Sequence, residues 1–244
     1  MRLDELLVGR GLFASRSRAR DAIERGTVLV DGAPAAKPGQ SVPASVAIDV
    51  ADPARSYVSR AALKLIAALD HFGLSPAGKD ALDIGASTGG FTQVLLERGA
   101  AHVTAIDVGH GQMHRTLKAD RRVSCIEGLN ARDLSAGDLD GRPPDFIVSD
   151  VSFISLTLAL PPALALARAG AAGVFLVKPQ FEAGREAIGK GGVLKNPADG
   201  QLAAERLAAW LGAIPGWRVL GLHASPIEGG DGNREFLLAG IKHQ

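Results

Sequence analysis

The spacing of apolar residues predicts an alternation of strands and helices from about residue 80 to the end of the chain. Short apolar runs indicate strands, and apolar residues at helical spacing indicate the helices between them. The expected strands are 80–84, 102–107, 122–127, 144–149, 172–178, 217–224 and 235–241. The expected helices are 89–98, 110–119, 155–169 and 197–213. This alternation is typical of a mostly parallel seven-stranded sheet with helices on both faces. A loop without a helix joins the last two strands, which allows an antiparallel final strand.

The first fifty residues have a different pattern. Helices are predicted at 2–11, closed by glycine, and at 15–26, where Ser15 is the expected N-cap and Gly26 the C-terminal stop. A strand, an Asp-Gly turn and further short strands follow. Two helices and a small β-unit predict a compact α+β module.

A domain boundary is expected where this β-unit ends. Pro53 cannot join a hydrogen-bonded ladder, and an amphipathic helix is predicted from Ser59. We therefore expect a small α+β domain over 1–54, a linker over 55–58 and an α/β domain over 59–244.

Composition excludes several classes of protein. Hydrophobic residues make up 46% of the 244 residues, enough for a sizeable core. The single cysteine rules out an intramolecular disulfide and fits a reducing, cytoplasmic compartment. The charged start lacks a signal core, and Pro161, Pro162 and Arg168 interrupt the most apolar stretch, 156–177. We expect a cytoplasmic protein without a membrane partner.

Net charge is only +1, but five arginines fall within the sixteen residues 10–25. A cluster of this kind on a small module is typical of surfaces that bind nucleic-acid phosphates. A solvated, charged helix face is the alternative.

The loop 85–90, after the first strand of the α/β domain, has the spacing Gly-x-x-x-Gly-Gly. Ser87 stands where the dinucleotide fingerprint has its second glycine, which argues against an NAD-dependent oxidoreductase. Asp107 ends the next strand and could accept hydrogen bonds from ribose hydroxyls. Asp83, an additional carboxylate before the loop, suits a cationic ligand better than a pyrophosphate. These features favour S-adenosylmethionine.

Charged residues also follow the later strands. Asp150 and Lys178 each close a predicted strand, so both should lie at the same edge of the sheet as the glycine loop. Lysine has a pKa of about 10.4, too high for a base at neutral pH unless burial or another cation lowers it. Lys64 and Glu235 are the further charged candidates, and Glu228 is an alternative to Glu235.

Three other motifs have weaker interpretations. Residues 184–191 match most of a P-loop, but Gly191 replaces the magnesium-binding hydroxyl and no helix follows directly. His110 and His114 have zinc-like spacing without an evident third ligand, so no metal is expected. Cys125, within a strand, is interpreted as a core residue.

Resemblances to known families add to this interpretation. The segment "RLDELLVGRGLFASRSRARDAIERGTVLVDG" resembles the α-L RNA-binding domain. The segments "LDIGASTGGFT", "AIDVG", "LNAR" and "SDVSFIS" resemble the S-adenosylmethionine site of Rossmann-like methyltransferases. With "SRAALKL", "LVKPQFE", "GGV" and "GNREFLL", nearly the whole chain resembles the hemolysin-A-like (TlyA) rRNA 2′-O-methyltransferases, related to the FtsJ-type enzymes.

The resemblance implies methyl transfer from S-adenosylmethionine to a ribose 2′-hydroxyl of ribosomal RNA. It implies that Lys178 activates the 2′-oxygen, that Asp150 orients Lys178, and that Lys64 and Glu235 position the hydroxyl. The expected cofactor-binding residues are Asp83, Gly85, Ala86, Ser87, Thr88, Gly89, Gly90, Phe91, Asp107, Val108, Asn130 and Asp150. The expected RNA-binding residues are Arg2, Arg10, Arg16, Arg18, Arg20 and Arg60.

Some alternatives stay open. Phe153 and Phe181 are expected either to stack on an extruded base or to belong to the core. The extent of the chain resembles a shorter subtype of the family that modifies a cytidine of large-subunit rRNA. Naked rRNA and the assembled subunit are both open as its substrate. Rival functions are an RNA-binding ribosome-assembly factor with a vestigial cofactor pocket and a membrane-lytic hemolysin. The oligomeric state is not predicted.

Overall fold

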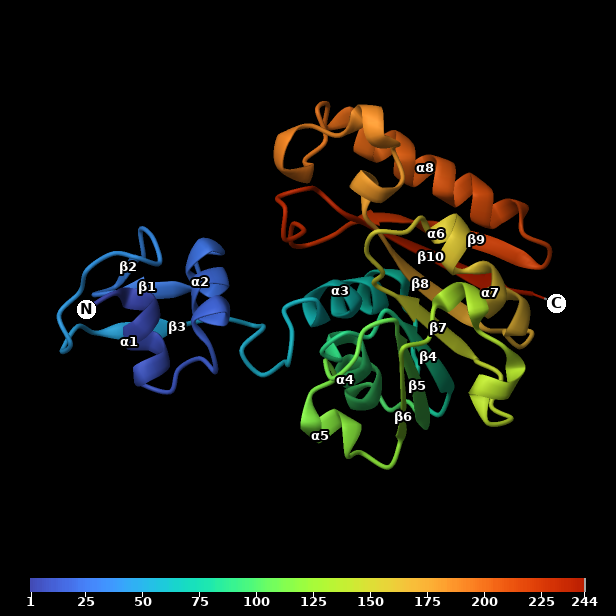
Figure 1. The fold of residues 1–244 in the computed structure, drawn as a ribbon, viewed down its shortest axis with the longest axis horizontal. Helices are drawn as coiled ribbons and strands as arrows, with labels where there is room; N and C mark the ends of the chain where they lie inside the picture. The colour runs from blue at the N-terminus through green and yellow to red at the C-terminus, as the bar shows by residue number, and fades with distance from the viewer. Residues whose placement is uncertain (244) are drawn as a thin grey trace. The chain divides into compact units, whose positions relative to one another are not determined.

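The structure is a computed structural model that describes residues 1–243; Gln244, the last residue of the expected domain 59–244, lies outside the described residues. The chain forms two compact units, Met1–Ser56 and Tyr57 onward (Figure 1). Each unit has its own hydrophobic core, so each is described by itself.

The N-terminal unit packs two helices against a small antiparallel sheet. Helices α1 (Leu3–Gly9) and α2 (Arg16–Glu24) precede β1 (Val28–Val30), β2 (Ala33–Pro34) and β3 (Ile48–Val50), in the sheet order β2-β1-β3. As expected, the Ser15 hydroxyl accepts a hydrogen bond from the Arg18 N–H at the start of α2. The core is apolar and draws on both helices: it includes Leu3, Leu7, Phe13, Ala19, Ala22, Ile23 and Val28.

The C-terminal unit is built on a seven-stranded sheet in the described part of the chain. Its strands are β4 (Asp80–Ile84), β5 (His102–Asp107), β6 (Val123–Glu127), β7 (Phe146–Ser149), β8 (Ala172–Val177), β9 (Trp217–Ala224) and β10 (Phe236–Lys242). Their order is β6-β5-β4-β7-β8-β10-β9. The first five run parallel, and β10 runs antiparallel to both of its neighbours. The predicted fold class, including the reversed final strand, is confirmed.

Helices cover both faces of this sheet (Figure 1). The core on one face includes residues of α3 (Ala62–Phe72), α4 (Gly90–Glu97) and α5 (Arg115–Lys118). The core on the other face includes residues of α6 (Leu156–Ala159), α7 (Pro161–Leu166) and α8 (Ala198–Ala213). The central strands are therefore buried from both sides, which explains their nearly continuous apolar runs.

Two predicted helices are shorter than expected. The helix predicted at 110–119 is reduced to α5, because Gly111 adopts a left-handed φ of 67° and His114 caps the helix through its side chain. The helix predicted at 155–169 is divided into α6 and α7. Pro161 and Pro162 supply no N–H to continue α6, but they suit the first turn of α7.

The sheet register brings distant charged residues to one edge. Phe236 pairs with Val177, so the residues next to them, Glu235 and Lys178, lie opposite each other at the strand ends. The parallel strands β4, β5, β7 and β8 end at this same edge. Side chains placed here are expected to form any ligand site of the fold.

Candidate active site

A cavity of about 890 Å³ lies at the carboxyl ends of the parallel strands. The loops after β4, β5 and β7 form most of its wall, and the segments after β6 and β8 complete it. Six of the predicted cofactor-binding residues line the cavity: Gly85, Ser87, Asp107, Val108, Asn130 and Asp150. Val108 is 67% exposed, an unusual value for an apolar side chain beside a cavity, so it offers an apolar surface to a ligand.

Asp107 shapes this wall through its carboxylate. One oxygen accepts a hydrogen bond from the Ser87 N–H at 2.8 Å, and the other accepts one from the Gly109 N–H at 2.7 Å. Each carboxylate oxygen can accept a second hydrogen bond, so Asp107 keeps capacity for a ligand hydroxyl. Ser87 adopts a left-handed φ of 47° and donates through Oγ to Gln112 Oε1 at 2.9 Å. Gln112 also lines the cavity, although its sequence position, within the helix predicted at 110–119, gives no sign of this role.

The second half of the glycine loop serves packing. A Cβ atom on Gly89 would overlap Leu117 and Met113, and one on Gly90 would overlap Ser59. Phe91 is 3% exposed and belongs to the core. Ala86 is also buried, and Thr88 is exposed but outside the cavity wall. The loop therefore fixes α4 against its neighbours as well as facing the cavity.

Asp83 lies beneath this loop and is fully buried. Its Oδ2 accepts a hydrogen bond from Thr92 Oγ1 at 2.6 Å, whereas Oδ1 has no hydrogen-bond partner among the described residues. Burial raises the pKa of Asp83 to about 7. Asp150 and Asp107 act in the same direction, since neighbouring negative charges disfavour a further carboxylate. The Asp83 carboxyl thus carries less than a full charge at neutral pH.

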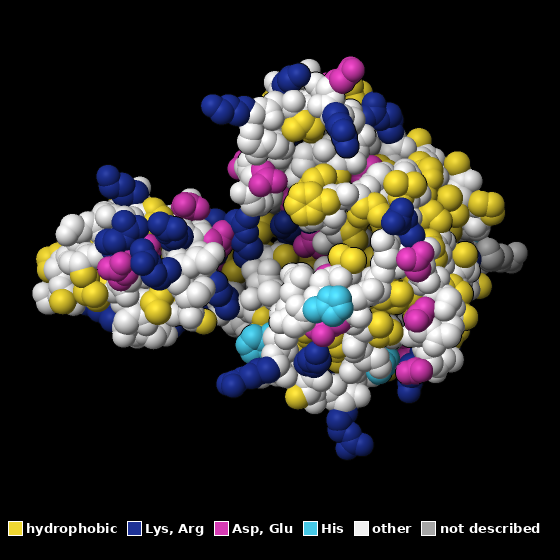
Figure 2. All heavy atoms as spheres, viewed as in Figure 1, with side chains coloured by type: hydrophobic (Ala, Val, Ile, Leu, Met, Phe, Trp, Pro, Cys, Tyr) yellow, Lys and Arg dark blue, Asp and Glu magenta, His cyan; other side chains and the backbone are white. Residues whose placement is uncertain are grey.

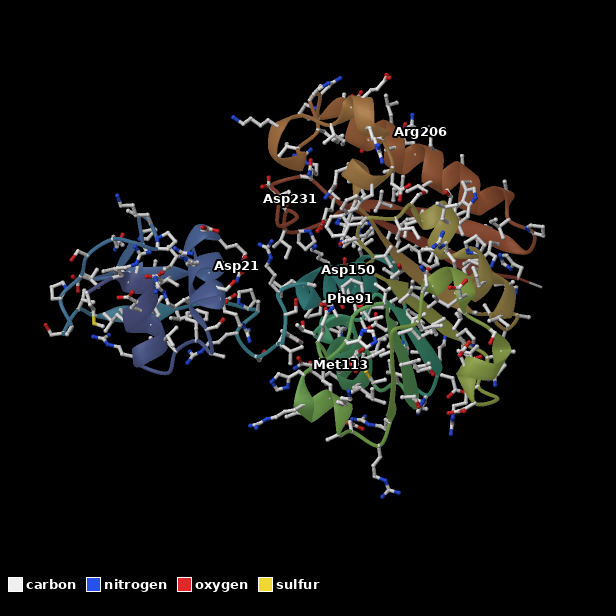
Figure 3. The ribbon with its side chains drawn as sticks, viewed as in Figure 1. Asp21, Phe91, Met113, Asp150, Arg206 and Asp231 are labelled. Carbon is white, nitrogen blue, oxygen red and sulfur yellow. The ribbon has the colours of Figure 1, made fainter. Side chains whose placement is uncertain are left out.

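Two ion pairs lie at the ends of β7, β8 and β10. Lys178 Nζ is 2.6 Å from Asp150 Oδ1 and donates to Ser152 Oγ at 2.8 Å. Figure 3 labels Asp150 near the ends of the central strands. Lys64 Nζ, on the first turn of α3, is 2.5 Å from Glu235 Oε2. All four residues of the predicted catalytic set are therefore paired.

The two ion pairs interact electrostatically. Lys64 and Glu235 are 5% and 2% exposed, and burial raises the pKa of Glu235. Lys64 and Lys178 oppose that rise in the pKa of Glu235, whereas Asp150 adds to it. Glu228, the alternative acid, is exposed. The geometry therefore favours Glu235 over Glu228 as the partner of the two lysines.

Two aromatic side chains border the cavity next to these pairs. Phe153 is 91% exposed and has a left-handed φ of 65°, which is unusual for a bulky residue. Its ring centroid lies 5.1 Å from that of Phe181, and both line the cavity. Glu182 joins the two segments, since it accepts hydrogen bonds from the Ser155 hydroxyl and the Leu156 N–H. Phe153 is therefore not a core residue.

The weaker motifs lie elsewhere. Residues 184–191 form short 3₁₀ turns with no helix immediately after them. His114 caps α5, and within residues 1–243 no three His, Cys, Asp or Glu side chains come together as a metal site. Cys125 packs against the core as predicted, and burial raises the pKa of its thiol.

The predicted RNA-binding arginines are distributed over both units. Arg2, Arg16 and Arg20 contact Asp4. Arg10 and Arg18 donate to backbone carbonyls, of Ala44 and Ala54 respectively. Arg60 is half-buried and precedes α3 in the second unit. Asp4 itself was missed, because its burial depends on the fold of the whole module.

Comparison with known proteins identifies both units. Residues 57–242 match the FtsJ-like methyltransferase family, and residues 1–48 match the S4 domain. The chain is 47% identical to the 16S/23S rRNA (cytidine-2′-O)-methyltransferase TlyA of Mycobacterium tuberculosis over 97% of this chain and 88% of the relative. It is 41% identical to Hemolysin A of Brachyspira hyodysenteriae, over 97% and 98% of the two chains.

Solved structures agree with these matches. A hemolysin-like protein from Streptococcus thermophilus superposes with a TM-score of 0.78 at 40% identity, covering 100% of this chain and 89% of the other. No helix among residues 1–243 is both long and apolar enough to cross a membrane. The chain belongs to the hemolysin-A-like (TlyA) family of rRNA methyltransferases, with an S4 domain followed by an FtsJ-like methyltransferase domain.

Proposed function

We propose that this protein transfers a methyl group from S-adenosylmethionine to the ribose 2′-hydroxyl of a cytidine in large-subunit ribosomal RNA. The observation that carries the proposal is the pairing of Lys178 with Asp150, which lines the cavity, and of Lys64 with Glu235, which interacts electrostatically with that first pair. The relatives from Mycobacterium tuberculosis and Campylobacter jejuni are both named as cytidine-2′-O-methyltransferases, and both names include 23S rRNA. That common substrate supports the choice of the large subunit.

The cavity wall fits S-adenosylmethionine by its chemistry. Asp107 has acceptor capacity for ribose hydroxyls, and exposed Val108 beside it suits an aromatic ring. Asp150 faces the same cavity, and Asp83 lies buried below the loop. A carboxylate in the cavity wall favours a ligand with positive charge, whereas the buried Asp83, with its raised pKa, contributes less than a full charge. When bound, S-adenosylmethionine supplies a methyl group activated by its sulfonium.

The first ion pair is proposed to act on the acceptor oxygen. Lys178 already uses donors toward Asp150 and Ser152, and an ammonium group has three. In the neutral amine form the third position is a lone pair, which can accept the 2′-hydroxyl proton while the 2′-oxygen takes the methyl group from the sulfonium. The adjacent Asp150 carboxylate orients the amine and stabilises the ammonium that forms. General acid–base groups of this kind contribute about 10²–10⁴ in rate.

The second ion pair is proposed to position the hydroxyl. Lys64 and Glu235 are almost fully buried, so their side chains have little freedom to move. Rigid placement of reacting groups is itself a large source of rate enhancement. Phe153 and Phe181 extend the cavity with aromatic surface, which suits a nucleobase taken out of its stack.

The proposal also assigns roles to the regions of the chain. Residues 1–54 bind structured RNA, 55–58 form a linker, and 59–244 carry out the transfer. The metal-free chemistry above requires only the side chains named and the methyl donor. Since the proposed substrate is ribosomal RNA, the proposed site of action is the cytoplasm.

Incubation of purified protein with methyl-labelled S-adenosylmethionine and unmodified large-subunit RNA tests the proposal. We expect label in 2′-O-methylcytidine after complete digestion of the RNA to nucleosides. Label confined to a base, or absent from the RNA and from intact large subunits alike, would contradict it. Calorimetry with the donor alone separates an active enzyme from an assembly factor with a vestigial pocket.

A further inference from the structure

The N-terminal unit contains a buried carboxylate surrounded by arginines. Among the described residues, Arg2, Arg16 and Arg20 all contact Asp4, which is fully buried. Arg2 donates from Nε to Oδ1 at 3.0 Å and from Nη2 to Oδ2 at 3.2 Å. Oδ2 also accepts from Arg16 Nη2 at 3.0 Å and from Arg20 Nε at 3.2 Å. One carboxylate thus fixes the guanidinium group of Arg2, just before α1, together with those of Arg16 and Arg20 on α2.

The exposure of these groups is uneven. Asp4 has no exposed side-chain surface, whereas the side chains of Arg2, Arg16 and Arg20 are 42%, 49% and 52% exposed. Hydrogen bonds from Arg2, followed by those from Arg16, hold the pKa of Asp4 well below its usual range. The carboxylate is therefore charged and hidden, and the arginines that cover it present their remaining donors to solvent.

The charges in this cluster do not balance. Arg16 also contacts Glu5, so three guanidinium groups meet two carboxylates. Arg25 in the same unit provides a contrast: it is only 15% exposed and is paired with both Asp21 and Asp52. Arg25 has the neutralised, enclosed arrangement of a structural ion pair. The Asp4 cluster keeps excess positive charge at the surface, as an anion-binding site does.

Arginine donors suit a phosphate anion. A guanidinium carries five N–H donors in a planar fork that matches the oxygens of phosphate. Flexible arginines lose side-chain freedom on binding, and a fixed carboxylate behind them removes part of that cost before the ligand arrives. Figure 2 shows Lys and Arg side chains gathered on the face of this unit that it presents.

We propose that Asp4 is a positioning residue that holds Arg2, Arg16 and Arg20 as a preformed site for the phosphates of structured RNA. This inference rests on the proposed function, because it takes RNA as the substrate. It goes beyond a general basic surface by assigning affinity for RNA to an acid that never touches the RNA.

The direction in which one substitution changes the affinity for RNA tests this role of Asp4. Asp4→Asn keeps the shape of the side chain and makes the unit more positive by one charge. Simple electrostatics predicts tighter binding of RNA, whereas loss of positioning predicts weaker binding. The measurement is fluorescence anisotropy of the full-length protein with a labelled RNA stem-loop, without methyl donor, over a series of salt concentrations.

We expect Asp4→Asn to weaken binding by about tenfold and to reduce the slope of log affinity against log salt by about one. Asp49→Asn is the matched control, since Asp49 is an exposed acid of the same unit outside the cluster. It makes the same change in charge and should bind RNA at least as tightly as wild type. Asp4→Asn binding as tightly as this control, with a native melting profile, would overturn the proposal.

A second variant covers the case in which Asp4→Asn does not fold. Arg20→Lys keeps the charge of a half-exposed side chain but replaces the planar fork with a point charge. We expect it to weaken binding by about threefold or more; wild-type affinity would overturn the proposal. Because these titrations omit the methyl donor, failure of methyl transfer would leave their outcome intact and would count against the proposed function alone.

Discussion

The side chains at the strand ends differ in how far they are exposed, and this difference separates their roles. Lys64 and Glu235 are almost completely buried, whereas Asp150 lines the cavity with Phe153 and Phe181. The buried pair is suited to holding geometry. The pair of Lys178 and Asp150 is suited to contact with the acceptor hydroxyl.

Replacement of Lys178 tests the assignment of the activating group. Lys178→Ala should lower the single-turnover rate of methyl transfer by at least about a hundredfold, because it removes the amine proposed to hold the 2′-oxygen. Calorimetry should show unchanged binding of the methyl donor. Lys190→Ala, at an exposed lysine in the 3₁₀ turn Lys190–Gly192, is the control and should keep the wild-type rate. A near-normal rate for Lys178→Ala would exclude this role.

Replacement of Glu235 tests the buried pair. Glu235→Gln leaves the Lys64 ammonium buried without a countercharge, so the free energy of unfolding should fall by roughly 3 kcal/mol. The same change at exposed Glu228 should have almost no effect. Urea denaturation of both variants measures the difference. Equal stability of the two would contradict the structural role of the Lys64–Glu235 pair.

The raised pKa of Asp83 predicts a pH dependence of stability. The folded protein binds this proton more tightly than the unfolded chain, in which a carboxyl titrates near pH 4. The contribution of Asp83 to the free energy of unfolding is therefore most favourable below about pH 4, and it falls as the pH rises to about 7. The loss amounts to roughly 4 kcal/mol for a shift of this size.

Asp83→Asn should remove this loss. The free energy of unfolding of the variant, relative to wild type, should then increase as pH is raised from about 4 to about 7. Urea titrations at several pH values within that window measure it. Parallel pH profiles for the two proteins would show that the buried carboxyl does not hold its proton.

At the scale of elements, local patterns predicted most strands but fewer helix boundaries. The parallel strands are buried on both sides, so their sequences are continuous apolar runs that can be recognised without the structure. Helix ends depend on single residues. Gly111 and the pair Pro161 and Pro162 shorten two predicted helices. The cavity wall depends on tertiary contacts such as Ser87 with Gln112, which no local pattern contains.

The Asn233 side chain ties residues 192–194, in the segment after β8, to the loop before β10. Asn233 is buried; its Oδ1 accepts from the Leu194 N–H at 3.0 Å and its Nδ2 donates to the Gly192 carbonyl at 2.9 Å. Asn233→Ala leaves both backbone groups without this partner and should cost about 2 kcal/mol in stability.

Loss of the Asn233 side chain should also increase hydrogen exchange at the Leu194 amide, because that N–H donates to Asn233 Oδ1. Gln201→Ala, on the exposed face of α8, is the control. Mass spectrometry of deuterium uptake in peptides covering residues 184–196 compares the Asn233→Ala and Gln201→Ala variants. Unchanged protection in Asn233→Ala would show that other contacts hold the segment.

At the scale of the whole molecule, alternation of strands and helices predicted the α/β fold, and the change of pattern before residue 60 predicted a second module. Among residues 1–243, three cores support this division in physical terms: one in the first unit and one on each face of the large sheet. The buried Asp4 and the exposed Phe153 could not be predicted, because their exposure depends on segments far apart in sequence.

Ribose methylation of ribosomal RNA by this protein can be measured in cells. Ribosomal RNA from cells lacking the protein is compared by mass spectrometry with RNA from cells supplied with wild type or Lys178→Ala. We expect one 2′-O-methylcytidine in large-subunit RNA that disappears with the protein, returns with wild type and does not return with Lys178→Ala. Identical ribose methylation in all these RNAs would contradict it.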